Sequence, residues 1–299
     1  MPQYYFDLYL KIYTTSANCL FFNSQNSIIK SMKSYNPKEN GNIKQKPQDL
    51  LLNYVLTIIL VLCLILSSIA YATSQVFNSA VVEGLSMFPT INSKYYKGDI
   101  AYYKQNAKIS RGDIIIINYK EAQKNIDAIK RVIALEGDTI CYYNGKILLN
   151  GSPLAENYLD EDYKLLSSDQ NVLKNGGFYS AEDWKTEGYN RSKESFENWC
   201  RILLNDEENK SSLAHTDFFT NYKTKYSNCI KYSTTLQAYT LTVPKGFVYF
   251  LGDNRKVSND SSIIGPLPTT EIDGKVSFIV QNDATTFNVF GKKIVNLFS

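Results

Sequence analysis

The chain has 299 residues, enough for one large domain or two modest ones, so a small secreted scaffold held by disulfides is excluded. Its 32 Lys and Arg nearly balance 29 Asp and Glu, and a formal net charge of +3 argues against nucleic acid as a partner. A hydrophobic content of 44% predicts a folded protein, and a single histidine disfavours His-based triads and His-ligated metal sites.

The N-terminal segment, residues 1–48, is polar and carries Pro2, Pro37 and Pro47. No apolar period persists through it, so it lacks the side chains that would fold it against a core. We therefore expect a poorly ordered tail.

A charge-free segment follows, from Leu50 to Val82, and it stays strongly apolar to about Tyr71. About 21 helical residues span roughly 31 Å, the thickness of the bilayer hydrocarbon, so the sequence predicts a transmembrane helix at 50–72. A cleaved signal peptide is the competing interpretation. It is disfavoured because about fifty residues precede the segment and because its apolar part is longer than usual.

Basic residues are distributed unevenly around this helix. Six lysines precede it, and no Lys or Arg follows it until Lys94. Because positive charge is retained on the cytoplasmic side, we expect a single-pass protein with a cytoplasmic N-terminus. Residues after about 72 then lie outside the cytoplasm, and the lipid bilayer is a partner.

Short β-branched runs bounded by Gly or polar residues predict strands beyond the helix. These runs lie at 99–103, 113–118, 129–134, 247–251 and 275–280. Asn144-Gly145 separates two further runs, 140–143 and 146–149, and this dipeptide is typical of a two-residue hairpin turn. We expect a mostly β fold, with an antiparallel-sheet domain over 78–299.

Between about 151 and 241 the sequence turns polar and irregular, which predicts an insertion with one amphipathic segment at 194–204. Its His215 is expected to be an exposed bystander. The five cysteines lack the paired spacing of zinc sites, so we expect no metal or other cofactor. Cys200 and Cys229 either form a disulfide or stay as two thiols, and their spacing does not decide between these states.

Two residues suggest nucleophilic chemistry without histidine. Ser86 lies in the segment Gly84–Thr90, and Lys130 interrupts an apolar strand beside Ile129. Burial lowers the pKa of a lysine and makes it a usable base, and a serine beside such a base becomes a nucleophile. Taken singly, Ser86 is more simply an ordinary turn serine and Lys130 a lysine whose amine reaches solvent.

A third segment, GDNRKVSNDSSIIGP at 252–266, follows a predicted strand and changes this balance. Together with it, four blocks in the same order carry a family resemblance: GLSMFPT at 84–90, RGDI at 111–114, KRVI at 130–133 and Gly137-Asp138. They resemble the bacterial type I signal peptidases, a family of membrane-anchored serine proteases. The resemblance covers 80–140 and 243–280.

The resemblance implies a role for each matching residue. Ser86 would be the nucleophile that forms the acyl-enzyme, Lys130 its base and later proton donor, and Ser258 the residue that hydrogen-bonds and orients the lysine. The backbone amide of Ser86 would serve as an oxyanion hole. Because Gly84 stands where some members have a serine, a second donor must be backbone or water.

Arg131, Asp253 and Asp260 match positions that support the site in this family. The family usually has an arginine where this chain has Ser262, so we expect Asp260 to share Arg131 with Asp253 or to go unpaired. This departure should cost local rigidity rather than chemistry, because it touches neither the nucleophile nor the base.

Substrate and location follow from the same resemblance. The family removes signal peptides from secretory precursor proteins at the inner (plasma) membrane, cutting after small side chains at the first and third positions before the scissile bond. Val82, Met87, Ile91 and Ile129 match pocket-lining positions. The same apolar side chains fit a plain core equally well.

Other interpretations remain beside a signal peptidase. A mitochondrial-type inner-membrane peptidase is related, and a self-cleaving repressor is disfavoured because a membrane helix stands where its DNA-binding domain would be. From another class comes a catalytically impaired homologue that binds precursors or scaffolds a translocation complex. Only Ser262 and the insertion favour it.

Overall fold

The structure is a computed structural model that describes residues 47–92, 98–121, 124–159, 163–164, 178–179, 184–205, 226, 228–282 and 284–297. The chain divides into two units, Met1–Leu64 and Ile65–Ser299. Residues 1–46 of the expected tail lie outside the described residues, and so does His215.

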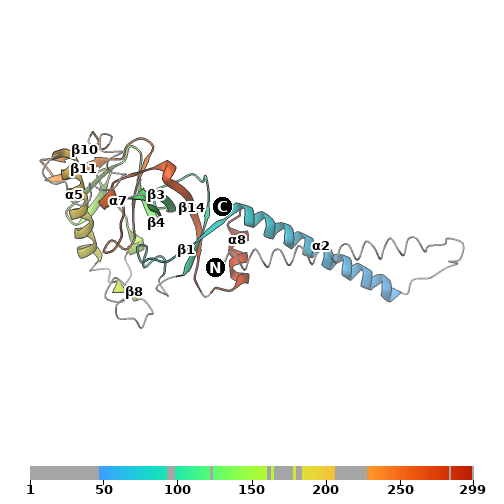
Figure 1. The fold of residues 1–299 in the computed structure, drawn as a ribbon. Coiled ribbons are helices and arrows are strands. Elements are labelled where there is room, and N and C mark those ends of the chain that lie inside the picture. Colours follow the sequence, from blue (N-terminus) through green and yellow to red (C-terminus); the bar gives the residue numbers. More distant parts are fainter. Residues whose placement is uncertain are drawn as a thin grey trace. The chain divides into compact units, whose positions relative to one another are not determined.

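Helix α2 (Pro47–Val76) is one uninterrupted helix (Figure 1). It starts at Pro47, which is tolerated there because the first-turn N–H groups have no partner within a helix. Its segment Leu51–Val76 contains an 18-residue window with a mean hydropathy of 2.7, and the segment is long and apolar enough to cross a membrane. None of its most apolar window is buried against protein, so its side chains are free to face lipid. The helix extends beyond the expected 50–72 at both ends.

The larger sheet has seven strands, and all of its pairings are antiparallel. Its spatial order is β1 (Asn78–Val82), β2 (Asp99–Lys104), β14 (Ile272–Val280), β3 (Ile114–Glu121), β4 (Lys124–Leu135), β12 (Phe247–Leu251) and β13 (Leu267–Pro268). This arrangement confirms the expected mostly β, antiparallel fold. Strand β4 is longer than the expected 129–134.

The second sheet has five strands in the spatial order β10 (Ile230–Ser233), β11 (Ala238–Thr242), β5 (Thr139–Tyr143), β6 (Lys146–Leu149) and β7 (Ser152–Pro153). Asn144 and Gly145, between β5 and β6, have φ values of 49° and 74°, as the expected two-residue hairpin turn requires. Strands β10 and β11 lie at the end of the segment expected to be irregular, and β11 pairs with β5. That part of the segment is therefore regular sheet.

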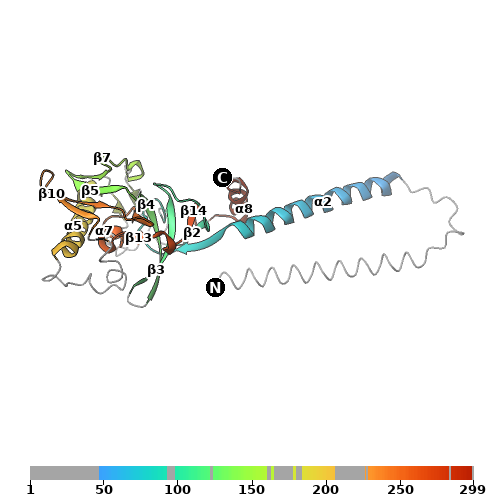
Figure 2. The ribbon, with the colours of Figure 1, turned by 90° about the horizontal axis from the view of Figure 1, so that it is seen from above.

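The remaining elements are short, except for two helices. They are η1 (Asn157–Leu159), β8 (Tyr163–Lys164), β9 (Phe178–Tyr179), η3 (Trp184–Gly188), α5 (Tyr189–Asn205), α7 (Ser261–Ile264), η5 (Thr269–Glu271) and α8 (Thr286–Val295). Helix α5 contains the expected amphipathic segment and begins five residues earlier than predicted. Figure 2 shows α5 beside α7 and the second sheet.

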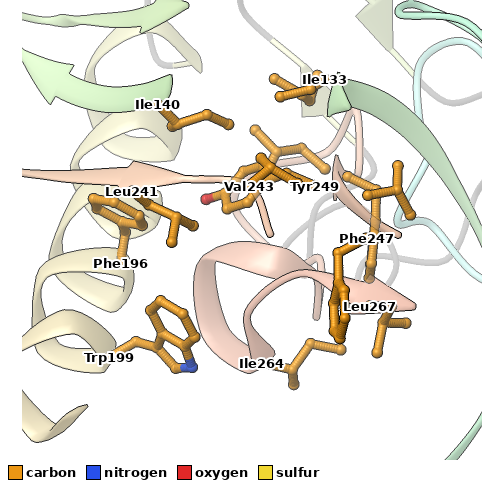
Figure 3. Packing of buried hydrophobic residues seen from close by; sticks show 14 of the residues in the cluster. Ile133, Ile140, Phe196, Trp199, Leu241, Val243, Phe247, Tyr249, Ile264 and Leu267 are labelled. Carbon is orange, nitrogen blue, oxygen red and sulfur yellow. The ribbon is translucent and has the colours of Figure 1, made fainter. Parts of the chain in front are cut away.

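The main core lies between the two sheets and α5 (Figure 3). Helix α5 contributes Phe196, Trp199, Cys200 and Leu203, which repeat at helical spacing and are all buried. Trp199 packs edge-on against Tyr226, with ring centroids 5.2 Å apart. Cys200 is a buried thiol, and Cys200 and Cys229 form no disulfide. The inserted helix is thus part of the core rather than a surface addition.

A smaller apolar cluster forms at the other side of the larger sheet. Its buried members are Val82, Met87, Ile91, Ala101, Ile116 and Ile129. The cluster joins β1, β2, β3 and β4 to the segment that follows β1. It therefore supports the residues that the sequence singled out for chemistry.

Candidate active site

Ser86 lies in a tight turn that follows β1. The turn is closed by hydrogen bonds from Phe88 N to Leu85 O at 3.1 Å and from Ile91 N to Met87 O at 3.0 Å. Met87 and Phe88 are fully buried, whereas Ser86 is only partly buried. The buried neighbours anchor the turn and leave the serine hydroxyl accessible.

Asn92 ties this turn to the end of β1. Its side-chain amide donates to Val82 O at 3.0 Å and to Gly84 O at 2.9 Å, and its backbone N–H donates to the Asp99 carboxylate at 2.7 Å. Asn92 is fully buried and has a φ of 61°, a conformation that asparagine tolerates better than most residues. Sequence reasoning missed this residue, because its role depends on contacts with distant backbone.

Lys130 is brought to Ser86 by strand β4, where it pairs with Ile115 of β3. Only 4% of Lys130 is exposed, which agrees with the expectation of a lysine directed into the protein. Its Nζ donates to Ser86 Oγ at 2.9 Å and to Ile129 O at 2.8 Å. The nucleophile and base expected from the sequence are therefore in direct contact.

Burial lowers the pKa of Lys130 from 10.5 to about 8, because the apolar surroundings disfavour the charged ammonium. The carboxylates of Asp260 and Asp253 oppose this effect and raise the same pKa, but less strongly. A lysine with this pKa supplies a useful fraction of neutral amine near neutral pH. That form can accept a proton from Ser86.

Ser258 lies in the loop after β12, next to both Gly252 and Ser86. A Cβ atom placed on Gly252 would lie 2.2 Å from Ser258 Oγ and 2.4 Å from Ser86 O. Only glycine fits where the backbone approaches this closely. The Ser258 hydroxyl is buried and has no hydrogen-bond partner among the described residues, so its expected hydrogen bond to Lys130 is not formed in this arrangement.

Arg131 and Asp253 form a two-pronged ion pair next to the site. Arg131 Nε lies 2.8 Å from Asp253 Oδ1 and Nη2 lies 2.6 Å from Oδ2. Thr90 Oγ1 donates to the same carboxylate, and the Arg131 guanidinium stacks over the Tyr158 ring at 4.0 Å. The pair links the residue after Lys130 to the loop that carries Ser258.

Asp260 does not share Arg131, contrary to one of the two expectations for it. Its carboxylate accepts hydrogen bonds from Gly252 N at 2.9 Å, Ser262 N at 3.1 Å and Ser262 Oγ at 2.8 Å. It caps the N-terminus of α7. Among the described residues, no Lys or Arg forms an ion pair with it. Ser262 therefore holds Asp260 in place, so the expected loss of rigidity at this position is offset.

A cleft of about 350 Å³ runs past Ser86 and Lys130. It is lined by Ala80, Val81, Val82, Glu83, Gly84, Ser86, Ile116, Asp127, Ala128, Ile129 and Lys130. Val82 and Ile129 line it as expected, whereas Met87 and Ile91 are fully buried within the smaller cluster and are not among the lining residues. Their apolar side chains serve the core at these two positions.

The cleft lies along strands whose edges carry no partner at this point. Strand β1 is at the end of the larger sheet, and β4 pairs with β12 only from Arg131 onward. An extended peptide can add main-chain hydrogen bonds to such edges. Among the residues that the structure describes, no group of three His, Cys, Asp or Glu side chains is placed to hold a metal ion.

Comparisons with known proteins found a matching protein family and several similar sequences. Residues 51–281 match the family described as signal peptidase, peptidase S26. A protein named signal peptidase I from Streptococcus pneumoniae serotype 4 is 31% identical over 215 residues, which cover 72% of this chain and 87% of the relative. Signal peptidase IB from Staphylococcus aureus (strain COL) is 26% identical over 198 residues, covering 66% and 74% respectively.

A solved structure, the signal peptidase I of Enterococcus faecalis V583, also matches. It covers 57% of this chain and 97% of its own, at 20% identity and a TM-score of 0.28.

Proposed function

The chain belongs to the peptidase S26 family of signal peptidases and is an enzyme that removes signal peptides, and we propose that it does so with Ser86 as nucleophile and Lys130 as base. The observation that carries the proposal is the 2.9 Å distance between Lys130 Nζ and Ser86 Oγ, with Lys130 buried. Ser258, Arg131, Asp253 and Asp260 would support this pair.

The reaction follows from these groups. The neutral amine of Lys130 takes the Ser86 hydroxyl proton while Oγ bonds to the scissile carbonyl carbon, and the Ser86 backbone amide receives the negative charge on the carbonyl oxygen. Lys130 then gives its proton to the leaving amine as the carbon–nitrogen bond breaks. Lys130 then deprotonates a water molecule that attacks the ester carbon, and it returns this proton to Ser86 Oγ as the bond between Oγ and the acyl carbon breaks and the acid is released.

The substrate would bind as an extended strand in the cleft between β1 and β4. Val82, Ile116 and Ile129 give this cleft an apolar wall close to Ser86, which suits small side chains before the scissile bond. Secretory precursors of that pattern are the substrates we propose.

Helix α2 would anchor the enzyme in the membrane as a single span. Its length and apolar composition support this role, and the six lysines before it favour a cytoplasmic N-terminus. The peptidase domain after the helix would then face outward from the plasma membrane, where secretory precursors emerge.

The mechanism is tested by Ser86→Ala and Lys130→Met, with Lys124→Met as the control because Lys124 is exposed on the same strand. Because nucleophile and base act as a unit, each of the first two variants should lower kcat/KM for a precursor by about three orders of magnitude or more. The control should keep wild-type activity, and circular dichroism should report a folded domain in all three.

Cleavage by Ser86→Ala at a rate comparable with wild type would contradict the dyad. Wild-type protein that binds a precursor without cutting it would instead identify a catalytically impaired homologue. The arrangement of Ser262 removes one of the two features that favoured that homologue, because this serine secures Asp260.

A further inference from the structure

Helix α5 of the inserted segment packs directly against the region that follows the Ser258 loop (Figures 1 and 2). Trp199 lies so close to Gly265 that a Cβ atom on this glycine would be 2.4 Å from the indole ring. Gly265 also has a φ of 81°, so glycine is required here on two grounds. The helix and the end of α7 therefore have a fixed contact.

Arg191, in the first turn of α5, reaches the Ser258 loop itself. Its Nη1 donates to Arg255 O at 2.9 Å and to Ser258 O at 2.9 Å. Within the loop, Ser258 N donates to Asn254 O at 3.0 Å, which forms a turn between those two residues. One guanidinium thus holds two carbonyls of that turn, and these charge-assisted bonds are stronger than neutral ones.

The opposite side of the same turn touches the reactive groups. Asn254 N donates to Ser86 O at 2.9 Å, and Asp253 pairs with Arg131 beside Lys130. The turn therefore lies between Arg191 and the nucleophile. The hydrogen bond from Asn254 N to Ser86 O connects Ser86 to the turn that Arg191 contacts.

We propose that Arg191 is a positioning residue for catalysis, which holds the turn at 254–258 against Ser86 and Lys130. The inserted helix then takes part in the reaction by fixing the geometry of the dyad. This inference rests on the proposed function of Ser86 and Lys130. Supporting residues of this kind matter because a reactive group must be held close to its productive geometry.

The test compares Arg191→Met with Arg201→Met, since Arg201 is exposed on the same helix. Full-length protein in detergent is assayed on a precursor across pH. Arg191→Met should lower kcat about tenfold while KM stays within about twofold, because neither α5 nor the turn lines the substrate cleft. Arg201→Met should match wild type.

The pH profile separates positioning from general destabilisation. Asp253 and Asp260 face Lys130 from the loop and raise its pKa, whereas burial lowers it more strongly. A loosened turn admits water to Lys130, so the acid limb of kcat should move to higher pH in Arg191→Met. A loss of folded protein alone would lower the plateau without moving that limb.

Arg191→Lys covers the case in which Arg191→Met does not fold. Its ammonium keeps a charged donor, and its acid limb should shift in the same direction by a smaller amount. A wild-type kcat and pH profile in either folded variant overturns the inference. If Ser86→Ala also stays active, the proposed dyad itself fails; if Ser86→Ala is inactive, only the role of Arg191 does.

Discussion

At the residue scale, the site depends on keeping one lysine where a lysine is unfavourable. Lys130 is 4% exposed, and its pKa falls from 10.5 to about 8. That difference corresponds to a cost of about 3 kcal/mol when the ammonium is buried at low pH. In the proposed mechanism this cost has a function, because an exposed lysine would be almost wholly protonated near neutral pH and could not act as a base.

Activity should therefore rise with pH through about 8, as the neutral amine of Lys130 forms. Stability follows the same group: between pH 8 and 10.5 the unfolded chain binds this proton and the folded chain does not. The contribution of Lys130 to the free energy of unfolding therefore increases with pH across that window and is constant below it. Lys130→Met should remove this dependence.

The measurements are a pH titration of kcat/KM for wild type, and denaturant unfolding of wild type and Lys130→Met at pH 7.5 and about pH 10. The free energy of unfolding of wild type should increase relative to that of Lys130→Met as pH rises. Activity that increases only above about pH 10, where an exposed lysine titrates, would contradict a desolvated base.

Single residues were predictable where their chemistry is unusual and less so where it is ordinary. A lysine inside an apolar strand and a serine in a family block identified Lys130 and Ser86, which are in contact. Met87 and Ile91 were expected in a pocket but are fully buried. Their positions could not be predicted because an apolar residue type does not distinguish a cleft from a core. Arg191 gave no signal, because its partners are backbone carbonyls more than sixty residues away.

At the element scale, strands with a strong β-branched pattern were easier to predict than strands fixed by their partners. Three of the first five residues of β4, from Lys124 to Ala128, are polar, and these five residues form a strand because they pair with β3. Strands β10 and β11 were missed for a similar reason, since exposed residues such as Lys231 and Tyr232 conceal their pattern. Tertiary pairing overrode local propensity at each of these places.

Helix α5 yields a prediction about stability. Trp199→Ala should lower the free energy of unfolding by about 3–5 kcal/mol, because it removes a fully buried ring that packs on Tyr226 and Gly265. The control is Leu204→Ala on the same helix, where the side chain is 39% exposed and the loss should be under about 1 kcal/mol.

Denaturant unfolding of the two variants measures this difference. The signal is far-UV circular dichroism, which does not rely on the tryptophan that one variant lacks. Equal losses in Trp199→Ala and Leu204→Ala would show that α5 is not built into the core. A large loss for Trp199→Ala alone would support an insertion that the peptidase domain needs in order to fold.

At the scale of the whole molecule, the chain combines a long apolar helix with a β domain that carries the reactive groups. The helix was predictable because a charge-free run of bilayer length has few other uses. The arrangement of the domain was less so, since its larger sheet joins β2 to β14 and β4 to β12 across wide gaps in the sequence. Only the order of the family blocks indicated that such distant segments meet.

The orientation of the chain is the last prediction, and it depends on charge rather than on the fold. Moving six lysines across a bilayer is unfavourable, so the segment before Pro47 should stay in the cytoplasm while residues after Val76 cross. With epitope tags at both ends, protease added to intact cells without a cell wall should remove the C-terminal tag and spare the N-terminal one. Detergent should expose both tags, which shows that each is cleavable. Loss of the N-terminal tag alone would reverse the topology and place the Ser86 cleft on the side where secretory precursors have not yet emerged.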